Sequence, residues 1–200
     1  RISVEGAIPD RLHALHTLTQ SRRSRRDYSG RALARCDFDA LLHVACGVTG
    51  SMRWAGRDVR LRAYPSSGAL YAVEIYPVVV RVEGLEPAVY HYRAVESVLE
   101  VVKPDLAPVH LVSAALPVER EMLSGAAVVL CHAGWFPRHE RKYGEGGYRM
   151  LVAEAGHISQ NLILAATALG ANARPFGGVF DDLLNRELGF DGGDEQFLLA

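Results

Sequence analysis

The sequence has little cysteine, and its cysteines stand far apart. Cys36, Cys46 and Cys131 are the three cysteines among 200 residues, and no two of them form a C-x-x-C pair. This spacing argues against a structural zinc site. Cys131, His132 and His139 could be drawn as metal ligands, but no fourth ligand accompanies them. An odd, sparse count also argues against a secreted disulfide scaffold, so we expect a reduced, cytoplasmic protein that holds no metal.

Long apolar runs and a charge excess are also absent. No run of about 18 residues is apolar throughout, so we expect no segment that spans a membrane. Residues 1–10 contain no apolar core of a signal peptide. Lys and Arg number 22 against 23 Asp and Glu, which gives a net charge of −1. A protein that coats nucleic acid would carry a large basic excess, so we expect no nucleic-acid partner.

Three common nucleotide and hydrolase motifs are missing. The chain has no G-x-G-x-x-G after a strand, no G-x-x-x-x-G-K-[ST] and no G-x-S-x-G. The run from Gly144 to Gly147 is rich in glycine but has none of these spacings. A standard dinucleotide-binding fold is therefore excluded.

The composition that remains is that of an ordinary globular domain. Hydrophobic residues make up 49% and charged residues 22% of the chain, which is a usual balance for a folded protein. A chain of this length can bury about 70% of its unfolded surface without disulfides or metals. We expect residues 1–200 to form a single domain, because no linker or internal repeat divides them.

Periodicity and turn residues predict an α+β fold in which helices flank and interrupt a central mixed sheet. Helices are predicted at residues 9–20, 37–46, 105–116, 148–169 and 179–188. Strands are predicted at residues 59–63, 74–82, 88–93, 97–102, 126–131 and 195–200. Asp37 is expected to cap the second helix, and Gly47 to end it. The polar segment from Trp135 to Gly147 is expected to be irregular.

An arginine cluster follows the first predicted helix. The run Arg22-Arg23-Ser24-Arg25-Arg26 offers four guanidinium groups and a hydroxyl. A guanidinium matches phosphate oxygens bidentately, and such charge-assisted contacts contribute roughly 1.5–3 kcal/mol each. The cluster indicates a phosphate-bearing ligand, although its spacing alone also fits a solvated basic turn or a nucleic-acid patch.

Two short loops could approach a ligand closely. Pro65, Ser66, Ser67 and Gly68 supply backbone N–H groups and two hydroxyls on a tight turn, which suits an anion or the polar edge of a ring. The segment from Pro175 to Gly178 could bring bare backbone against a flat ligand, because glycine has no Cβ. Each loop by itself also fits an ordinary connection between elements.

Lys142 and Tyr143 form a candidate acid–base pair. Neighbouring residues can reach one site only from a loop or a helix end, because within a helix they diverge by about 100°. A tyrosine with a pKa of about 10 is a poor base at neutral pH, and lowering the pKa by two units needs about 2.7 kcal/mol. An ammonium about 4 Å away supplies on the order of 4 kcal/mol at an effective dielectric of about 20. The pair is thus adequate for proton abstraction, and the alternative is two surface residues.

Polar residues interrupt the long apolar helix near the C-terminus. Glu154, His157, Gln160 and Asn161 would need partners if they were buried. They could contact a ligand or form hydrogen bonds to the neighbouring chain, and for His157 we favour a hydrogen-bonded position in the core.

Taken together and in order, these segments resemble the flavin-dependent nitroreductase family. The resemblance is closest to its peptide-maturing branch, the SagB-type or thiazole/oxazole-forming dehydrogenases, and it covers about residues 15–200. The similar segments are Arg22–Arg26, Arg62–Tyr71, Lys142–Glu145, Tyr148-Arg149, Glu154–Leu162, Ala168–Gly170 and Gly177-Gly178.

The resemblance implies a homodimer that binds two FMN molecules in clefts between its subunits. By this resemblance Arg22, Arg23, Ser24 and Arg26 hold the FMN phosphate and ribityl chain. Pro65, Ser66, Ser67 and Gly68 approach the same flavin from the partner chain. Gly177 and Gly178 offer backbone N–H to the reactive ring nitrogen, and Lys142 and Tyr143 match a catalytic Lys–Tyr pair.

The activity implied is oxidation of a peptide thiazoline or oxazoline to the thiazole or oxazole. The substrate is a ribosomal peptide or a peptide tethered to a carrier protein, and a cyclodehydratase or a nonribosomal synthetase is the expected partner. The missing initial Met suits an oxidase domain excised from a longer protein. The alternatives are an NAD(P)H-dependent reductase of nitro compounds, quinones or enones, and a non-catalytic flavin-binding scaffold subunit.

Overall fold

The structure is a computed structural model that describes residues 8–104, 114 and 117–200. Helices, including short 3₁₀ turns labelled η, are η1 (Asp10–Leu12), α1 (His13–Ser21), α2 (Arg35–Cys46), η2 (Ser67–Ala69), α4 (Pro117–Ser124), α5 (Phe136–Tyr143), η3 (Gly144–Gly146), α6 (Gly147–Ala168) and α7 (Asp181–Leu188). Strands are β1 (Val48–Trp54), β2 (Arg57–Arg62), β3 (Val73–Val79), β4 (Ala88–Arg93), β5 (Val98–Lys103), β6 (Val128–Trp135) and β7 (Glu195–Leu199). The predicted helix at 105–116 lies almost entirely outside the described residues.

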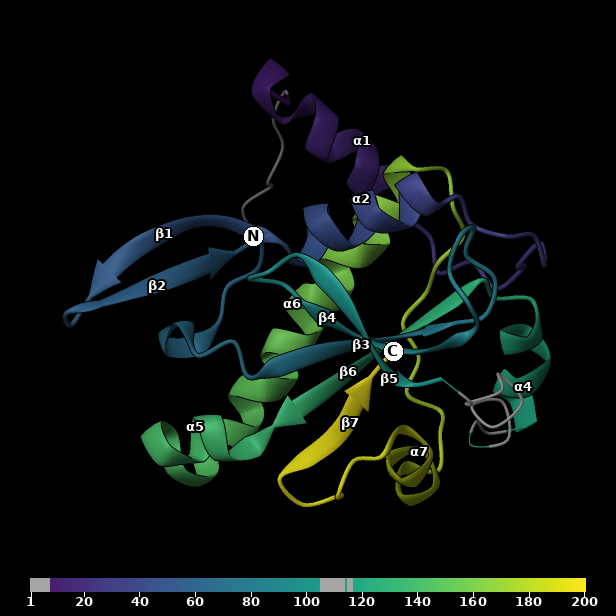
Figure 1. Ribbon diagram of the computed structural model, residues 1–200. Coiled ribbons are helices and arrows are strands. Elements are labelled where there is room, and N and C mark those ends of the chain that lie inside the picture. The colour runs from purple at the N-terminus through teal and green to yellow at the C-terminus, as the bar shows by residue number, and fades with distance from the viewer. Residues whose placement is uncertain (1–7, 105–113, 115–116) are drawn as a thin grey trace, which may run out of the picture.

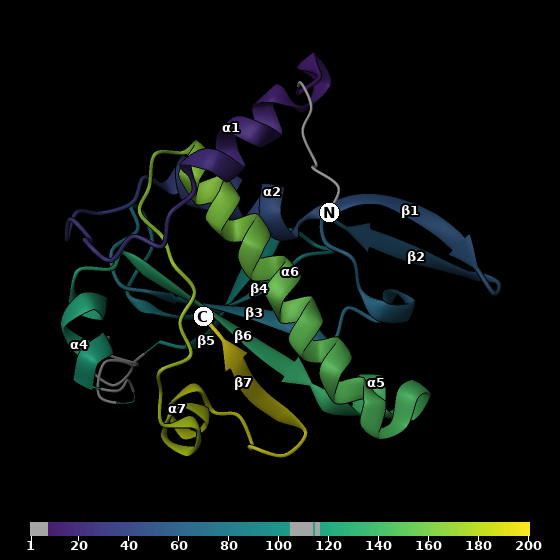
Figure 2. The same cartoon turned by 180° about the vertical axis from the view of Figure 1, so that it is seen from behind.

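A five-stranded sheet in the order β5-β4-β3-β6-β7 forms the centre of the fold. Helices α2 and α6 lie against one face, and α4 and α7 lie on the opposite side (Figures 1 and 2). The α+β class and the helix-flanked sheet are therefore confirmed.

The expectation of a mixed sheet is wrong for these five strands, because every pairing between them is antiparallel. The connection from β6 to β7 contains four helical elements, α5, η3, α6 and α7, yet β7 begins opposite Trp135, where β6 ends. Helix α6 carries the chain away from that end and residues 174–194 carry it back, so β7 runs opposite to β6. One parallel bridge, between Leu33 and Val82, lies outside the named strands.

Alternation along the central strands separates two hydrophobic layers. On β3, Val73, Ile75 and Val79 pack toward α2 and α6, whereas Tyr76 and Val78 pack toward α4 and α7. Successive side chains of a strand point to opposite faces, so a strand covered on both sides is apolar nearly throughout. This is why β3 and β6 were recognisable from their composition.

Two segments differ from the sequence-based expectation. Strand β1 was not predicted, because Gly50 and Ser51 interrupt its β propensity. With β2 it forms an exposed hairpin that projects from the body (Figure 1). The segment after Trp135 is a helix, α5, and not irregular. Pro137 occupies the first turn of α5, where proline is favourable. The helix was not predicted because many of its residues are charged and leave no clear period of apolar side chains.

The caps and polar positions of the helices were partly predicted. Gly47 ends α2 as expected, but Asp37 lies in the first turn and the N-cap residue is Ala34. His157 is exposed on α6 and not in the core, whereas Glu154 is buried. Among the described residues, no helix is long and apolar enough to cross a membrane, and no three His, Cys, Asp or Glu side chains gather as metal ligands.

Asn161 gives a test of how α6 is joined to the rest of the fold. Its Nδ2 donates to the carbonyl oxygens of Ala45 at 3.3 Å and Ala63 at 3.2 Å. Asn161→Ala should lower the free energy of unfolding by about 1–3 kcal/mol, because both carbonyls lose their donor. Gln160→Ala, an exposed neighbour, should stay within about 0.5 kcal/mol of wild type in the same urea titration. Equal unfolding midpoints for the two variants would contradict this role.

Candidate active site

Lys142 and Tyr143 lie at the C-terminal end of α5, directly before Gly144, whose φ is +57°. The Lys142 ammonium lies 5.2 Å from the centroid of the Tyr143 ring. The sequence predicted that this pair could reach a single site from a loop or from a helix end, and the structure shows a helix end.

The loop at Gly68 lies against this pair. A Cβ added at Gly68 would lie 2.6 Å from the Tyr143 hydroxyl and would also collide with the Lys142 ammonium. Gly68 has a φ of +64°, so glycine satisfies both the backbone and the close approach. The structure thus brings the predicted Pro65–Gly68 loop and the predicted Lys–Tyr pair together within one chain.

A buried carboxylate fixes this loop to the central helix. Glu154 on α6 accepts a hydrogen bond of 2.5 Å from the Ser66 hydroxyl and one of 3.0 Å from the N–H of Val73. The Ser66 oxygen in turn accepts from the N–H of Tyr71 at 2.8 Å. Glu154, which the sequence marked only as a polar interruption, is therefore a structural anchor of the site.

The environment of Glu154 perturbs its ionisation. Burial raises the pKa of this carboxyl above its usual range, although the hydrogen bonds from Ser66 and Val73 and the charges of Arg62 and Arg138 oppose the rise. The Gly68 loop is therefore anchored by a carboxyl group of α6 whose charged form is costly to bury.

The arginine cluster lies elsewhere, on the segment that follows α1. The N–H of Arg25 donates to the carbonyl oxygen of Ala173 at 3.3 Å, and Asn172 Nδ2 donates to the carbonyl oxygen of Asp27 at 2.8 Å. Ser24 and three of the four arginines are exposed, and Arg22 is half-buried. None of the ion pairs among the described residues involves these four guanidinium groups, so the cluster is a site of uncompensated positive charge.

Gly177 and Gly178 lie close in sequence to the segment that contacts the arginine cluster. The N–H and carbonyl of Phe176 pair with those of Ala200, which places the glycines next to the end of β7. Within the described part of the chain, no backbone hydrogen bond uses the N–H of Gly177 or Gly178. Among the described residues, the nearest atom to a Cβ added at Gly177 would be a Leu199 methyl carbon at 4.0 Å, so the backbone of Gly177 is open, whereas a Cβ added at Gly178 would lie 3.1 Å from the Glu119 Cγ.

The predicted site residues therefore form two groups near opposite ends of β6. Lys142, Tyr143 and the Gly68 loop lie beyond Trp135, since α5 starts at the next residue (Figure 2). The arginine cluster lies toward the Val128 end, where Gly30 donates to the carbonyl oxygen of Gly125, whereas Gly177 and Gly178 lie between the two groups, next to Leu199, which pairs with His132 near the middle of β6. An eight-residue strand spans roughly 23 Å from first to last Cα. A single chain thus holds the two groups apart.

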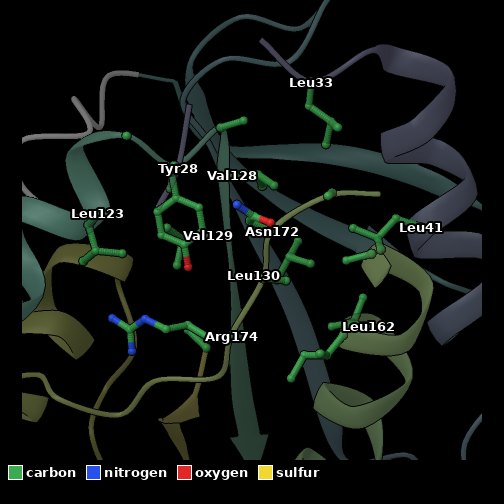
Figure 3. A pocket seen from close by; sticks show the side chains of 18 of the residues that line it. Tyr28, Leu33, Leu41, Leu123, Val128, Val129, Leu130, Leu162, Asn172 and Arg174 are labelled. Carbon is green, nitrogen blue, oxygen red and sulfur yellow. The ribbon is translucent and has the colours of Figure 1, made fainter. Parts of the chain in front are cut away.

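A cavity of about 350 Å³ lies behind the arginine segment, between residues 27–33, strand β6 and residues 170–174 (Figure 3). Apolar side chains from β6, α2 and α6 make up much of its wall, and Tyr28 and Arg174 lie on the polar side. The Arg174 guanidinium forms a buried ion pair with Glu119. None of the predicted site residues lines this cavity.

Two residues that were not predicted as site residues, Arg62 and Arg138, support the Gly68 loop through Tyr71. Arg62 donates its backbone N–H to the Tyr71 hydroxyl at 3.1 Å and holds its guanidinium 5.0 Å from the centre of the Tyr71 ring. Arg138 on α5 donates to the Tyr71 carbonyl oxygen at 2.5 Å. Arg138 was missed because α5 was not predicted as a helix. Residues four apart, such as Arg138 and Lys142, share a face only when the segment is helical.

Comparison with known proteins identifies the class. The model of the nitroreductase family matches residues 19–200, so the chain belongs to the nitroreductase family and is an oxidoreductase of that family. It is 33% identical over 162 residues to the Methanocaldococcus jannaschii protein MJ1384, which is named as a nitroreductase, and this match covers 80% of the chain and 77% of MJ1384.

Two peptide-processing proteins are more distant relatives. The trifolitoxin-processing protein TfxB of Rhizobium leguminosarum bv. trifolii is 33% identical over 136 residues, which cover 65% of this chain and 36% of TfxB. The microcin B17-processing protein McbC of Escherichia coli is 29% identical over 134 residues, which cover 65% of this chain and 49% of McbC. The matched part is therefore half or less of each of these two proteins.

Solved structures agree with the fold. The Escherichia coli microcin synthetase complex McbBCD, with a truncated pro-microcin B17 bound, contains a chain that superposes with a TM-score of 0.78 at 25% identity, over 100% of this chain and 74% of that one. A nitroreductase from Desulfovibrio desulfuricans in complex with FMN superposes with a TM-score of 0.61 at 18% identity, over 94% of this chain and 82% of that one.

Glu154→Gln tests the anchoring of the Gly68 loop through the pH dependence of stability. The amide keeps the shape but has one acceptor oxygen for two donors, so the variant should be less stable by about 1–3 kcal/mol at low pH. Because the pKa of Glu154 is higher in the folded than in the unfolded protein, protonation of Glu154 stabilises the folded state. This stabilisation is complete below the unfolded pKa of about 4.3 and is lost as the pH rises through the folded pKa. The stability gap between wild type and Glu154→Gln should therefore narrow from pH 4 upward in urea titrations.

The exposed residue Glu140 on α5 provides the control. Glu140→Gln should stay within about 0.5 kcal/mol of wild type. A gap for Glu154→Gln that widens with rising pH would show that the buried carboxyl is stabilised in its charged form, contrary to the assignment.

Proposed function

We propose that this protein is an FMN-dependent dehydrogenase that oxidises peptide thiazolines or oxazolines to thiazoles or oxazoles. The observation that carries the proposal is the meeting of Lys142, Tyr143 and the Gly68 backbone in one place. The relation to TfxB and McbC, two proteins named for processing peptides, supports it. We further propose that residues 1–200 make one FMN-binding domain.

The residues present fit FMN. Four guanidinium groups without carboxylate partners among the described ion pairs suit a phosphate, so Arg22, Arg23 and Arg26, with Ser24, would hold the phosphate and ribityl chain. The open N–H groups of Gly177 and Gly178 would donate to the ring system. Bound FMN would supply the hydride acceptor, and dioxygen would reoxidise it.

Lys142 and Tyr143 perform the proton chemistry. The azoline ring loses one carbon-bound proton and one hydride, and the resulting ring is aromatic. Tyr143, reacting as the phenolate beside the Lys142 ammonium, accepts the proton and becomes the neutral phenol, while Ser66, Ser67 and Gly68 confine the substrate beside the flavin. Orientation and proton transfer are thus the protein's contributions.

We propose a homodimer in which each flavin contacts both chains. The two groups of site residues lie near opposite ends of β6, and a two-fold axis would bring each group of one chain against the other group of its partner. The outer face of α6 supports such an axis. Tyr148 and Val152 are 60% and 46% exposed there, and no atom lies within 4 Å of a Cβ added at Gly156, so a second helix could approach closely.

The substrate is proposed to be a peptide, ribosomal or tethered to a carrier protein, and the protein partner a cyclodehydratase or a synthetase subunit. McbC belongs to a complex that was solved with a peptide bound. The second candidate function is an NAD(P)H-dependent reduction of nitro compounds, quinones or enones, which the similarity to MJ1384 favours. Consumption of NAD(P)H with a nitroaromatic acceptor but no oxidation of an azoline peptide would select this second function.

Variants of the Lys–Tyr pair test the chemistry. The purified protein should be yellow and release FMN on denaturation, and with a thiazoline peptide it should produce a peptide lighter by two hydrogen atoms in mass spectrometry. Tyr143→Phe and Lys142→Ala should retain the flavin but oxidise the peptide about 10²–10⁴-fold more slowly, because each removes part of the general base. Tyr90→Phe, on β4, removes a hydroxyl that donates to the Glu86 carbonyl oxygen away from the site, and this variant should oxidise at the wild-type rate. Wild-type rates in both site variants, with full flavin content, would refute the assignment.

Complementation between subunits tests the shared site. Arg22→Ala/Arg26→Ala and Tyr143→Phe variants should each be inactive alone. Co-expressed, they should recover about a quarter of wild-type activity, because half of the random dimers contain one site made only of wild-type groups. If each chain supplied all groups of its own site, the mixture would stay inactive.

A further inference from the structure

The loop before β3 is held in an unfavourable backbone conformation. Gly68, Ala69 and Tyr71 have φ values of +64°, +51° and +47°, and only the first is a glycine. Left-handed conformations of other residues are disfavoured and persist where surrounding contacts determine them, often beside functional sites. The contacts that determine this loop therefore also determine where Gly68 lies.

Most of those contacts come from one side. Glu154 on α6 binds Ser66, the Ser66 oxygen receives the N–H of Tyr71, and Arg62 at the end of β2 binds the Tyr71 hydroxyl. These bonds fix the loop to the body of the protein. They do not fix it relative to α5, which carries Lys142 and Tyr143.

Arg138 makes the connection to α5. Its Nη1 donates to the Tyr71 carbonyl oxygen at 2.5 Å and to Glu74 Oε1 at 2.9 Å. Glu74 is itself held by His91, whose Nε2 lies 3.2 Å from Glu74 Oε2. Burial alone would raise the pKa of Glu74, but the hydrogen bond from His91 and the charge of Arg138 outweigh it and keep the pKa below its usual range. The carboxylate therefore stays charged and holds the guanidinium in place.

We propose that Arg138 is a positioning residue that sets the distance between the Gly68 loop and the Lys142–Tyr143 end of α5. Arg138 precedes Lys142 by one helical turn, so the two side chains share a face of α5 and the loop meets both. The kinetic part of this inference rests on the proposed azoline oxidation. The geometric part does not.

Arg141 is the matched control. It lies on the same helix, directly before Lys142, and it is exposed. Arg138→Gln and Arg141→Gln each remove one positive charge. If loss of charge alone perturbs Lys142, Arg141→Gln should perturb it at least as much as Arg138→Gln. If the hydrogen bonds of Arg138 position Lys142, only Arg138→Gln should perturb it.

The lysine content of the chain permits a direct measurement. Lys103 and Lys142 are the two lysines, so reductive ¹³C-methylation gives two lysine resonances besides that of the amino terminus. Lys103 donates to the Glu187 carbonyl oxygen at 2.6 Å and serves as an internal reference. Arg138→Gln should shift the Lys142 resonance beyond its line width, while Arg141→Gln should leave both resonances in place.

Kinetics on the flavin-loaded, unmethylated protein complete the test. Arg138→Gln should lower kcat for azoline oxidation about 10- to 100-fold, as small misplacements of catalytic groups do, with KM and flavin content unchanged. The proposal is overturned if Arg138→Gln leaves the Lys142 resonance in place, if Arg141→Gln shifts it equally, or if the resonance shifts without a change in kcat. If the wild type oxidises no azoline, the proposed function fails, and the resonances alone decide whether Arg138 positions Lys142.

Discussion

The carboxylate of Glu154 is the contact on which the candidate site depends. It is buried on α6 and binds both the Ser66 hydroxyl and the first N–H of β3. One side chain thus joins helix α6, strand β3 and the loop that precedes β3. Because that loop has two non-glycine residues at positive φ, it needs such an anchor to keep its shape. The cost is a buried carboxyl with a raised pKa, which is acceptable because two donors and the nearby Arg62 and Arg138 charges offset part of the desolvation.

The parts of the fold that the sequence predicted are those with a strong local pattern. Strands β3, β4 and β6 are rich in Val, Ile and Tyr because they are buried on both faces, and α6 has a long apolar stripe that ends near Gly170. Strand β1 and helix α5 were missed for the opposite reason. β1 is exposed and lacks β-branched residues along much of its length, and α5 buries only His139 completely, so neither leaves a clear hydrophobic period.

The candidate site was predictable as a set of segments but not as a geometry. Lys142-Tyr143 and the loop ending at Gly68 were both singled out from the sequence, and the structure brings them together. The loop is held by hydrogen bonds to Glu154, which is distant in sequence, and from Arg138, which lies in a helix that was not predicted and is itself bound by Glu74. Charged residues of this kind have no periodic signature, because their positions are set by single hydrogen bonds between elements and not by a repeated face.

The division of the site between the two ends of β6 follows from the same architecture. Lys142 and Tyr143, which we propose for the proton chemistry, lie where the C-terminal end of α5 meets the Gly68 loop. Phosphate binding needs uncompensated cations open to a charged ligand, and the arginine cluster lies on an extended segment at the far end, where no ion pair of the described residues neutralises it. Placed together in one chain, four guanidinium groups would disfavour a nearby ammonium and compete for the buried carboxylates that hold the loop. In the proposed dimer, separation by the length of a strand would keep both groups functional, and a two-fold axis is the simplest operation that would bring them together around one ligand.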